Sequence, residues 1–311
     1  MKRYHPTPPS EAPRFAGVAT FLRLPHVTDP ADVDVAVIGL PLDTGVSVRA
    51  GARFGPKAVR EAALGLRPEY NPAQRVALFE RLSVVDWGDA GVVPGFVGRS
   101  LERLEAALAP LHAAGVVPLG LGGDHTVTLA ELRAAARHHG PLALIHFDAH
   151  GDTLDEYGGE RYAHATVVRR AVEEGLVDPA RSTQLGLRGG LSGPGGYDEA
   201  RALGFEIVPW LDLAQLGTGV VEMAVERAAG KAFLTFDLGF VDPAFAPGVG
   251  GPEVGGPSSM QALALLRGCR GLDLAGADVV EVVPDLDVSQ LTAALAATVA
   301  WEILGLMACA R

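Results

Sequence analysis

Three residues that can bind a metal ion stand at alternate positions after one apolar segment. The run 142–147 leads directly into Asp148, His150 and Asp152. Side chains two residues apart in an extended chain point to the same face, so these three can converge on one point. Two carboxylates and an imidazole suit a hard or borderline divalent cation. The competing interpretation is a solvated acidic loop that contains an incidental histidine.

Two other apolar segments end in residues of the same kind. Val117–Leu121 is followed by two glycines, which allow a tight turn, and then by Asp124 and His125. Ala232–Phe236 is followed by Asp237. Taken alone, His125 fits a buried, hydrogen-bonded histidine equally well. Ligand candidates after three separate segments argue against coincidence, and together they predict a metal site.

Apolar runs and segments of helical period alternate along the chain. The predicted strands are Asp34–Leu40, Ser83–Trp87, Val117–Leu121, Leu142–Phe147, Thr183–Leu187, Glu206–Pro209, Ala232–Phe236 and Gly276–Val282. The predicted helices include Leu101–Ala114, Thr128–His139, Thr166–Glu174, Val220–Ala229 and Ser258–Arg267. This alternation is typical of an α/β fold with a mainly parallel sheet covered by helices on both faces. We expect one three-layer α/β/α domain over residues 1–311, with residues 1–30 as an extended N-terminal arm. Ligands of such sheets bind beyond the carboxyl ends of the strands, where the polar residues lie.

Composition restricts the possible partners and the location of the protein. Of 311 residues, 48% are hydrophobic, and the formal net charge is −11. That charge argues against general affinity for nucleic acid or an anionic membrane, and it leaves room for a cationic substrate. The two cysteines, Cys269 and Cys309, indicate a reducing compartment without a disulfide framework. The N-terminus lacks the apolar core of a signal peptide, so we expect a cytoplasmic protein.

The most apolar stretch lies at the C-terminus. Leu291–Cys309 is interrupted by Thr292, Thr298 and Glu302. No uninterrupted apolar run reaches the ~18 residues of a membrane span. We interpret this stretch as a core helix.

These residues form signatures of a known family. Three occur in order: Gly122-Gly123-Asp124-His125-Thr126, Phe147-Asp148-Ala149-His150-Gly151-Asp152, and Phe236-Asp237-Leu238-Gly239 leading into Asp242-Pro243-Ala244-Phe245-Ala246-Pro247-Gly248. With them the chain resembles the ureohydrolase superfamily of arginases and agmatinases, from about Pro13 to the C-terminus. Glu281 matches the guanidinium-binding glutamate of that family, and His164 matches a histidine of its specificity loop. Read without the family, Glu281 fits a solvent-facing carboxylate and His164 a surface residue at a helix start.

Other segments point to one branch of the superfamily. Leu40–Gly45, Gly51–Pro56, Pro13–Gly17 and Arg23–Pro25 resemble agmatinases and guanidinobutyrases. The loop after the second signature lacks the Asn- and Ser-rich pattern of arginases. The resemblance therefore implies hydrolysis of a small linear guanidino compound, with agmatine, giving putrescine and urea, as the expected substrate. A guanidinobutyrase or a related guanidino-acid hydrolase is the alternative. The resemblance also implies a homo-oligomer, either a trimer or a hexamer.

The resemblance implies a centre with two Mn²⁺ ions bridged by a hydroxide. One ion would be held by His125, Asp148, Asp152 and Asp237. The other would be held by His150, with Asp148 and Asp237 bridging, which places Asp148 among the catalytic residues. Glu281 would bind the guanidinium group, and His164 would donate or relay the proton that releases the amine. His146, His138 and His139 are expected to have structural roles only.

The sequence departs from the family pattern close to this centre. Gly239 stands where the family has an aspartate two residues after the bridging one, so the second ion would have a weakened site. Val249 and Gly251 replace threonines, and Ala165 replaces a glycine. Three interpretations follow: an active guanidino hydrolase with a weakened second metal, a binding or regulatory protein that has lost catalysis, and a different amidine or amide hydrolase that uses one metal.

Charged residues near the metal-binding segments bear on the substrate. Asp155, Glu156 and Glu160 outnumber Arg161 in the loop that follows Asp152. An acidic loop favours agmatine, whose far end is an ammonium group, over a guanidino acid. The alternative is a solvated loop without a role in recognition.

Overall fold

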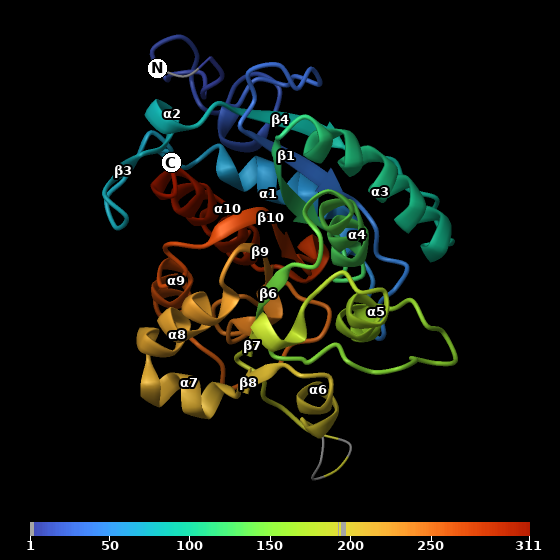
Figure 1. Ribbon diagram of the computed structural model, residues 1–311. Helices are drawn as coiled ribbons and strands as arrows, with labels where there is room; N and C mark the ends of the chain where they lie inside the picture. Colours follow the sequence, from blue (N-terminus) through green and yellow to red (C-terminus); the bar gives the residue numbers. More distant parts are fainter. Residues whose placement is uncertain (1–2, 192, 194–196) are drawn as a thin grey trace.

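A single parallel sheet forms the middle of the molecule (Figure 1). The structure is a computed structural model that describes residues 3–191, 193 and 197–311. The eight strands lie in the order β4-β1-β5-β10-β9-β6-β7-β8, and every pairing is parallel. Their bounds are β1 Val35–Leu40, β4 Val84–Asp89, β5 Val117–Gly122, β6 Ala143–Phe147, β7 Thr183–Leu185, β8 Glu206–Val208, β9 Lys231–Asp237 and β10 Asp273–Val280. All eight predicted strands are present, with ends shifted by a few residues at most.

Burial explains why these segments read as continuous apolar runs. Every residue of β1 and of β6 is buried. A strand that is covered by helices on both faces has no solvent face, so apolar residues occupy successive positions instead of alternate ones. This is the pattern from which a parallel sheet was expected.

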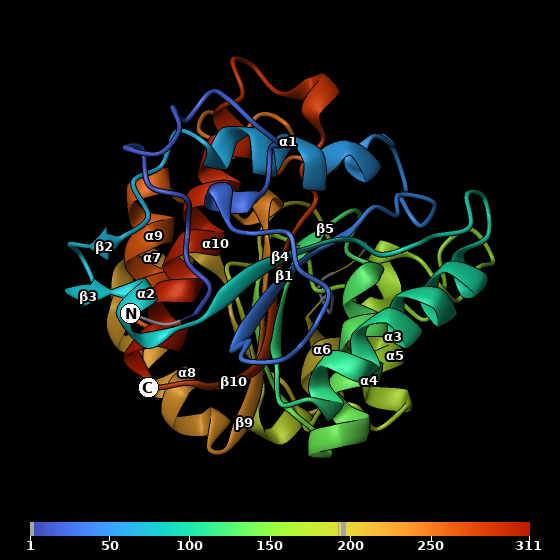
Figure 2. The ribbon, with the colours of Figure 1, turned by 90° about the horizontal axis from the view of Figure 1, so that it is seen from above.

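The helices form a layer on each side of the sheet (Figure 2). One hydrophobic cluster contains residues of α1, α7, α8, α9 and α10, and the other contains residues of α3, α4, α5 and α6. Their bounds are α1 Gly55–Ala63, α3 Val97–Ala113, α4 Val127–His139, α5 Val167–Glu173, α6 Asp198–Ala202, α7 Trp210–Leu216, α8 Thr218–Ala228, α9 Ser259–Arg267 and α10 Leu291–Cys309. The three-layer α/β/α prediction is confirmed.

Several short elements were not predicted. They are α1, α6, α7, the four-residue helix α2 Leu78–Arg81, and the small hairpin of β2 Tyr70–Asn71 and β3 Val76–Ala77. Between residues 3 and 30 the expected arm is irregular apart from the short turn Phe21–Arg23, and residues 1–2 lie outside the described part. Within the arm, Phe21, Leu22 and Leu24 are buried, so the C-terminal end of the arm belongs to the hydrophobic core.

The C-terminal stretch is a core helix. Among the described residues, α10 is the one helix long and apolar enough to cross a membrane, but 78% of its apolar window is buried within the fold. Its first turn is held by Asp287, whose carboxylate accepts the N–H groups of Thr292 and Ala293. The buried environment accounts for the hydropathy of this helix.

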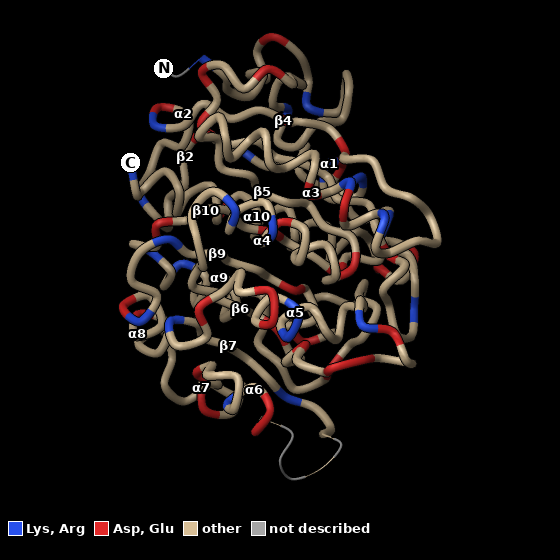
Figure 3. Tube along the Cα trace, turned by 45° about the vertical axis from the view of Figure 1, so that its right-hand side comes forward, with Lys and Arg blue, Asp and Glu red and all other residues tan. Residues whose placement is uncertain are grey.

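The strand order decides where the chemistry lies. The neighbours β1, β5, β10, β9 and β6 are all parallel, so their carboxyl ends and the loops that follow meet at one edge of the sheet. Along the Cα trace, Lys and Arg residues alternate with Asp and Glu residues in the outer elements (Figure 3). Because these strands are parallel neighbours, the predicted ligands gather at this edge of the sheet.

Candidate active site

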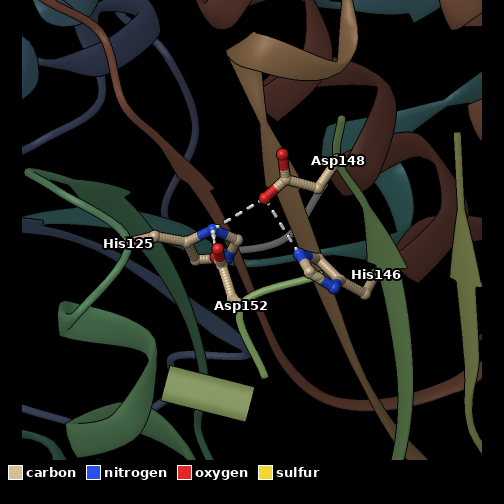
Figure 4. Close-up of side chains that lie close together, drawn as sticks. All are labelled: His125, His146, Asp148 and Asp152. Carbon is tan, nitrogen blue, oxygen red and sulfur yellow. Dashed lines mark hydrogen bonds and ion pairs between the residues drawn. The ribbon is translucent and has the colours of Figure 1, made fainter. Parts of the chain in front are cut away.

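His125 lies at the centre of a ring of carboxylates. Its Nδ1 atom is 3.1 Å from Asp148 Oδ2, 3.0 Å from Asp152 Oδ2 and 3.3 Å from Asp237 Oδ2. Figure 4 shows the His125 ring directed at Asp148 and Asp152. His125 follows β5, Asp148 and Asp152 follow β6, Asp237 is the last residue of β9, and all four are buried. The structure thus brings together the four residues expected to hold the first ion.

The surroundings of His125 require a positive charge. Its Nε2 atom is 2.8 Å from Thr235 Oγ1, while Nδ1 is buried without a hydrogen bond of good geometry. Burial lowers the pKa of His125, but its contacts with Asp148, Asp152 and Asp237 outweigh burial and raise the pKa well above the usual value. The Nδ1 lone pair and three carboxylate oxygens at one point need a proton or a metal ion between them. This donor set fits a divalent cation such as Mn²⁺.

The two carboxylates that the family resemblance expects to bridge two ions differ in their surroundings. Asp148 is buried, which raises its pKa, but close contacts with the imidazole rings of His125, His146 and His150 lower it well below the usual value. Burial and the charge of Asp148 raise the pKa of Asp237 to about 7. Two buried carboxylates at one site repel each other, so one ionises less readily unless a cation is present.

His146 lies inside the cluster, although a structural role was expected for it. Its Nε2 atom is 3.1 Å from Asp148 Oδ2 (Figure 4). On the other side of the ring, the Gln184 amide nitrogen is 2.9 Å from Nδ1 and 2.7 Å from the carbonyl of Gly151. Because the amide N–H groups donate, Nδ1 accepts, and the neutral ring carries its proton on Nε2 and donates it to Asp148.

This hydrogen bond makes His146 a positioning residue for Asp148. The other carboxylate oxygen of Asp148 accepts the main-chain N–H of His150 at 2.9 Å, so both oxygens are oriented by the protein. Sequence reasoning missed the role of His146. The available signal was its place two residues before Asp148, on the same face of the strand.

Glu281 and His164 form a second group beside the ring of carboxylates. Glu281 Oε1 accepts the main-chain N–H of His125 at 2.9 Å and lies 3.1 Å from His164 Nδ1. Burial lowers the pKa of His164, but the hydrogen bond and charge of Glu281, with the charges of Asp152 and Asp124, raise it to about 9. The site therefore favours a proton on His164 at neutral pH.

Two site residues have unusual backbone conformations. The φ angle is 67° at Glu281 and 51° at Asp152, in the left-handed region that few residues other than glycine adopt. The N–H of Glu281 donates to the carbonyl of Gly123 at 2.8 Å, and the carbonyl of Asp152 accepts the N–H of Val168 at 3.0 Å. Surrounding hydrogen bonds hold these conformations, as is common at functional sites.

Comparison with known proteins agrees with this geometry. Residues 33–305 match the model of the Arginase family. The chain belongs to the Arginase family. It is 46% identical to a guanidinopropionase of Pseudomonas aeruginosa over 99% of this chain and 98% of that protein. It is 42% identical to an agmatinase of Neisseria meningitidis over 91% of each. Among solved structures, proclavaminate amidinohydrolase from Streptomyces clavuligerus superposes with a TM-score of 0.92 at 39% identity, covering 96% of this chain and all of that one.

Among the ligand candidates of this arginase-family chain, His150 has the side chain most exposed to solvent. Its side chain is 41% exposed, and its Nδ1 atom is 3.3 Å from Asp148 Oδ1. Its Nε2 atom lies 3.8 Å from Glu253 Oε1. His150 thus lies next to Asp148, with which the family resemblance expects it to hold the second ion.

Gly239 lies directly against Asp237. The Gly239 N–H donates to Asp237 Oδ1, and a Cβ atom built on Gly239 would lie 2.8 Å from that oxygen. A Cβ atom at position 239 would therefore be too close to Asp237 Oδ1 unless that carboxylate shifts. The weakened second site stays a prediction of the sequence analysis.

A cavity of about 330 Å³ adjoins the site. Ser47, His150, Asp152 and His164 line the end near the metal ligands. Its remaining lining includes Thr153, Leu154, Leu187, Arg188, Leu191, Tyr197 and Glu199. The cavity reaches Asp152 of the ring and His164, and it shares His150, His164 and Gly251 with a smaller pocket that Asp237 and Glu281 also line.

The charged loop residues expected to select the substrate lie elsewhere. The described lining of this cavity includes none of Asp155, Glu156, Glu160 and Arg161. Asp155 pairs with Arg170, Arg161 pairs with Glu173, and Glu160 lines a separate cavity with Phe96 and Arg99. The acidic-loop argument for agmatine therefore has no support in the structure.

Proposed function

We propose that this chain hydrolyses the guanidino group of a small linear guanidino compound, with Mn²⁺ as cofactor. The observation that carries the proposal is the convergence of His125, Asp148, Asp152 and Asp237 on one buried point beside Glu281. His150, with Asp148 and Asp237, would hold a second ion. A divalent cation bound in this ring acidifies water, so a nucleophile for the guanidinium carbon is available near neutral pH.

Glu281 is placed to bind the guanidinium group. Its Oε1 atom already accepts from His125 and His164, whereas Oε2 faces Gly250, where a built Cβ atom would lie 3.5 Å away. Glu281 also lines a small pocket with His164 and Asp237, from which a substrate N–H group would reach Oε2. A charge-assisted hydrogen bond there fixes the guanidinium group next to the ring of carboxylates. His164 supplies the proton for the departing amine.

The two candidate substrates differ in the charge at the end opposite the guanidino group. The sequence analysis predicts agmatine, although the loop charges on which that prediction depended do not line the cavity. A guanidino acid is the second candidate, because a guanidinopropionase is 46% identical over nearly the full length of both chains. The charges of the cavity agree with an anionic tail: Glu199 is paired with Arg169, whereas the described hydrogen bonds of Arg188 go to main-chain carbonyls.

A urea-release assay with added Mn²⁺ tests the proposal. The panel contains agmatine, 3-guanidinopropionate, 4-guanidinobutyrate and arginine at equal concentrations. Urea from at least one linear guanidine supports the proposal, and the kcat/KM ratios rank the tails. A protein that binds Mn²⁺ but releases no urea from any of them is the catalytically impaired family member considered as the alternative. A parallel ammonia-release assay with amide and amidine substrates tests the one-metal hydrolase, which activity there alone would favour.

Two further expectations stay predictions. We propose a cytoplasmic protein that assembles as a trimer or hexamer. Light scattering at micromolar protein measures the assembly, and a monomer mass would contradict it.

A further inference from the structure

The loop after β1 places a serine against the outer side of His164. The Ser47 N–H donates to His164 Nε2 at 3.1 Å, and Ser47 Oγ lies 2.8 Å from the same nitrogen. Across the ring, His164 Nδ1 is 3.1 Å from Glu281 Oε1. A carboxylate, an imidazole and a hydroxyl therefore stand in line, each within hydrogen-bond reach of the next. This is the geometry by which an oriented imidazole exchanges protons with a hydroxyl.

The position of this serine is fixed by the fold. The Gly45 N–H donates to Asp124 Oδ2 at 2.8 Å, and the His164 N–H donates to the Gly45 carbonyl at 3.0 Å. Asp124 is itself fully buried after β5. The loops after β1 and β6 are thus joined to each other, which keeps Ser47 beside His164.

The main-chain contact determines how His164 exchanges its proton. A backbone N–H can only donate, so neutral His164 accepts at Nε2 and carries its proton on Nδ1, toward Glu281. When His164 is protonated, its Nε2–H needs an acceptor, and Ser47 Oγ is the acceptor that the structure places there. Both ring nitrogens of His164 then contact protein groups. Ser47 lines the cavity, so its hydroxyl is the group through which the proton leaves His164.

We propose that Ser47 relays the proton from His164 to the departing amine. The inference rests on the proposed function. The Nε2–H proton of His164 moves to Ser47 Oγ while the Ser47 hydroxyl proton moves to the leaving nitrogen. The C–N bond breaks with its electron pair on that nitrogen, which leaves as the amine. His164 ends neutral, and Ser47 ends with one proton as before.

Two substitutions separate a relay from a purely structural contact. Ser47→Ala retains the main-chain N–H and removes only the hydroxyl, whereas Ser47→Thr retains a hydroxyl. We expect Ser47→Ala to lower kcat by roughly 100-fold, within the usual range for acid–base groups, with KM and Mn²⁺ content unchanged. Ser47→Thr should restore kcat to within about tenfold of wild type. The solvent deuterium isotope effect on kcat should change in Ser47→Ala, because one of the two proton transfers in this step is removed.

A second measurement does not depend on turnover. In ¹⁵N-histidine NMR spectra of the Mn²⁺-free protein, the Nε2 signal and the pKa of His164 should shift in Ser47→Ala and return toward wild type in Ser47→Thr. An unchanged His164 signal in Ser47→Ala, or full activity with an unchanged isotope effect, would overturn the relay. If wild type releases no urea while the NMR shift is present, the proposed function fails but the Ser47–His164 contact stands, and the relay to an amine is rejected with the function.

Discussion

The main-chain N–H of His125 donates to Glu281 Oε1 at 2.9 Å, which joins a metal-ligand candidate to the substrate-binding candidate. The link runs through the backbone of His125, so the imidazole stays free for a metal ion. Glu281 can therefore be changed without removing any metal-binding side chain. This separation makes the two roles distinguishable by mutation.

We predict that Glu281→Gln lowers urea release by about 100-fold or more while Mn²⁺ stays bound. The amide still has an oxygen to accept the N–H of His125, but the charge that binds guanidinium is lost. Glu281→Ala should abolish release. Metal content and urea are measured on the same samples. Loss of Mn²⁺ in Glu281→Gln, or wild-type turnover in either variant, would contradict the assigned role.

We predict that His146→Leu weakens Mn²⁺ binding by about 10–100-fold, the usual effect of removing a group that orients a metal ligand. Asp148 would lose the N–H that fixes one of its oxygens. His146→Gln should recover part of the affinity, because its amide can donate from a similar position. Isothermal titration measures the affinities.

The control for this prediction is His138→Leu. His138 is exposed at the end of α4 and distant in sequence from the metal ligands. If His146→Leu and His138→Leu bind Mn²⁺ equally well, His146 is only a core residue.

The strands and the metal ligands could be predicted from the sequence because local patterns determine both. Continuous apolar runs identify buried parallel strands, and ligand candidates follow those runs directly. The sequence places His146 on the same strand face as Asp148, but its contact with Gln184, and the contact of Ser47 with His164, arise only in the folded chain. The substrate prediction stays open: Asp155 is close to Asp152 in sequence, but it pairs with Arg170 and is not among the lining residues of the cavity.

A second buried acidic group does not belong to the ring of carboxylates. Glu131 of α4 is buried, its two carboxyl oxygens have no hydrogen-bond partner, and Asp278 of β10 accepts from Thr128 at 2.6 Å. Burial, and then the charge and contact of Asp278, raise the pKa of Glu131 well above its usual value, while the charge of His125 opposes this. The folded chain therefore binds a proton at Glu131 that the unfolded chain releases at lower pH.

We predict that Glu131→Gln makes the protein more stable at alkaline pH. A raised carboxyl pKa gives a contribution to stability that is complete below the unfolded pKa of about 4.3 and is lost as pH rises through the folded pKa. The Gln side chain has no proton to lose, so its advantage over wild type should grow between pH 5 and pH 9. Thermal unfolding with chelator present measures this. Glu222→Gln, at an exposed position of α8, is the control and should show no such trend.

The last prediction concerns Gly239 and the second ion. In wild type, the Gly239 N–H satisfies one oxygen of Asp237, and no carboxylate at position 239 is available to complete the shell around an ion next to His150. A hard cation loses affinity with each charged ligand that is missing. We therefore expect wild type to bind a second Mn²⁺ more weakly than the first, and urea release to rise with Mn²⁺ beyond saturation of the first site.

Gly239→Asp should strengthen the second site by about tenfold or more and raise turnover at low Mn²⁺. The new Cβ atom would begin 2.8 Å from Asp237 Oδ1, so this carboxylate must shift slightly. Gly239→Ala separates the two effects, because it introduces the same crowding without a ligand and should weaken the site or leave it unchanged. Mn²⁺ titrations followed by electron paramagnetic resonance distinguish one bound ion from a coupled pair. If wild type already binds two ions with equal affinity, or if Gly239→Asp binds only one, the missing aspartate does not limit this site. In the second case the crowding at Asp237, which Gly239→Ala shares, would be the dominant effect.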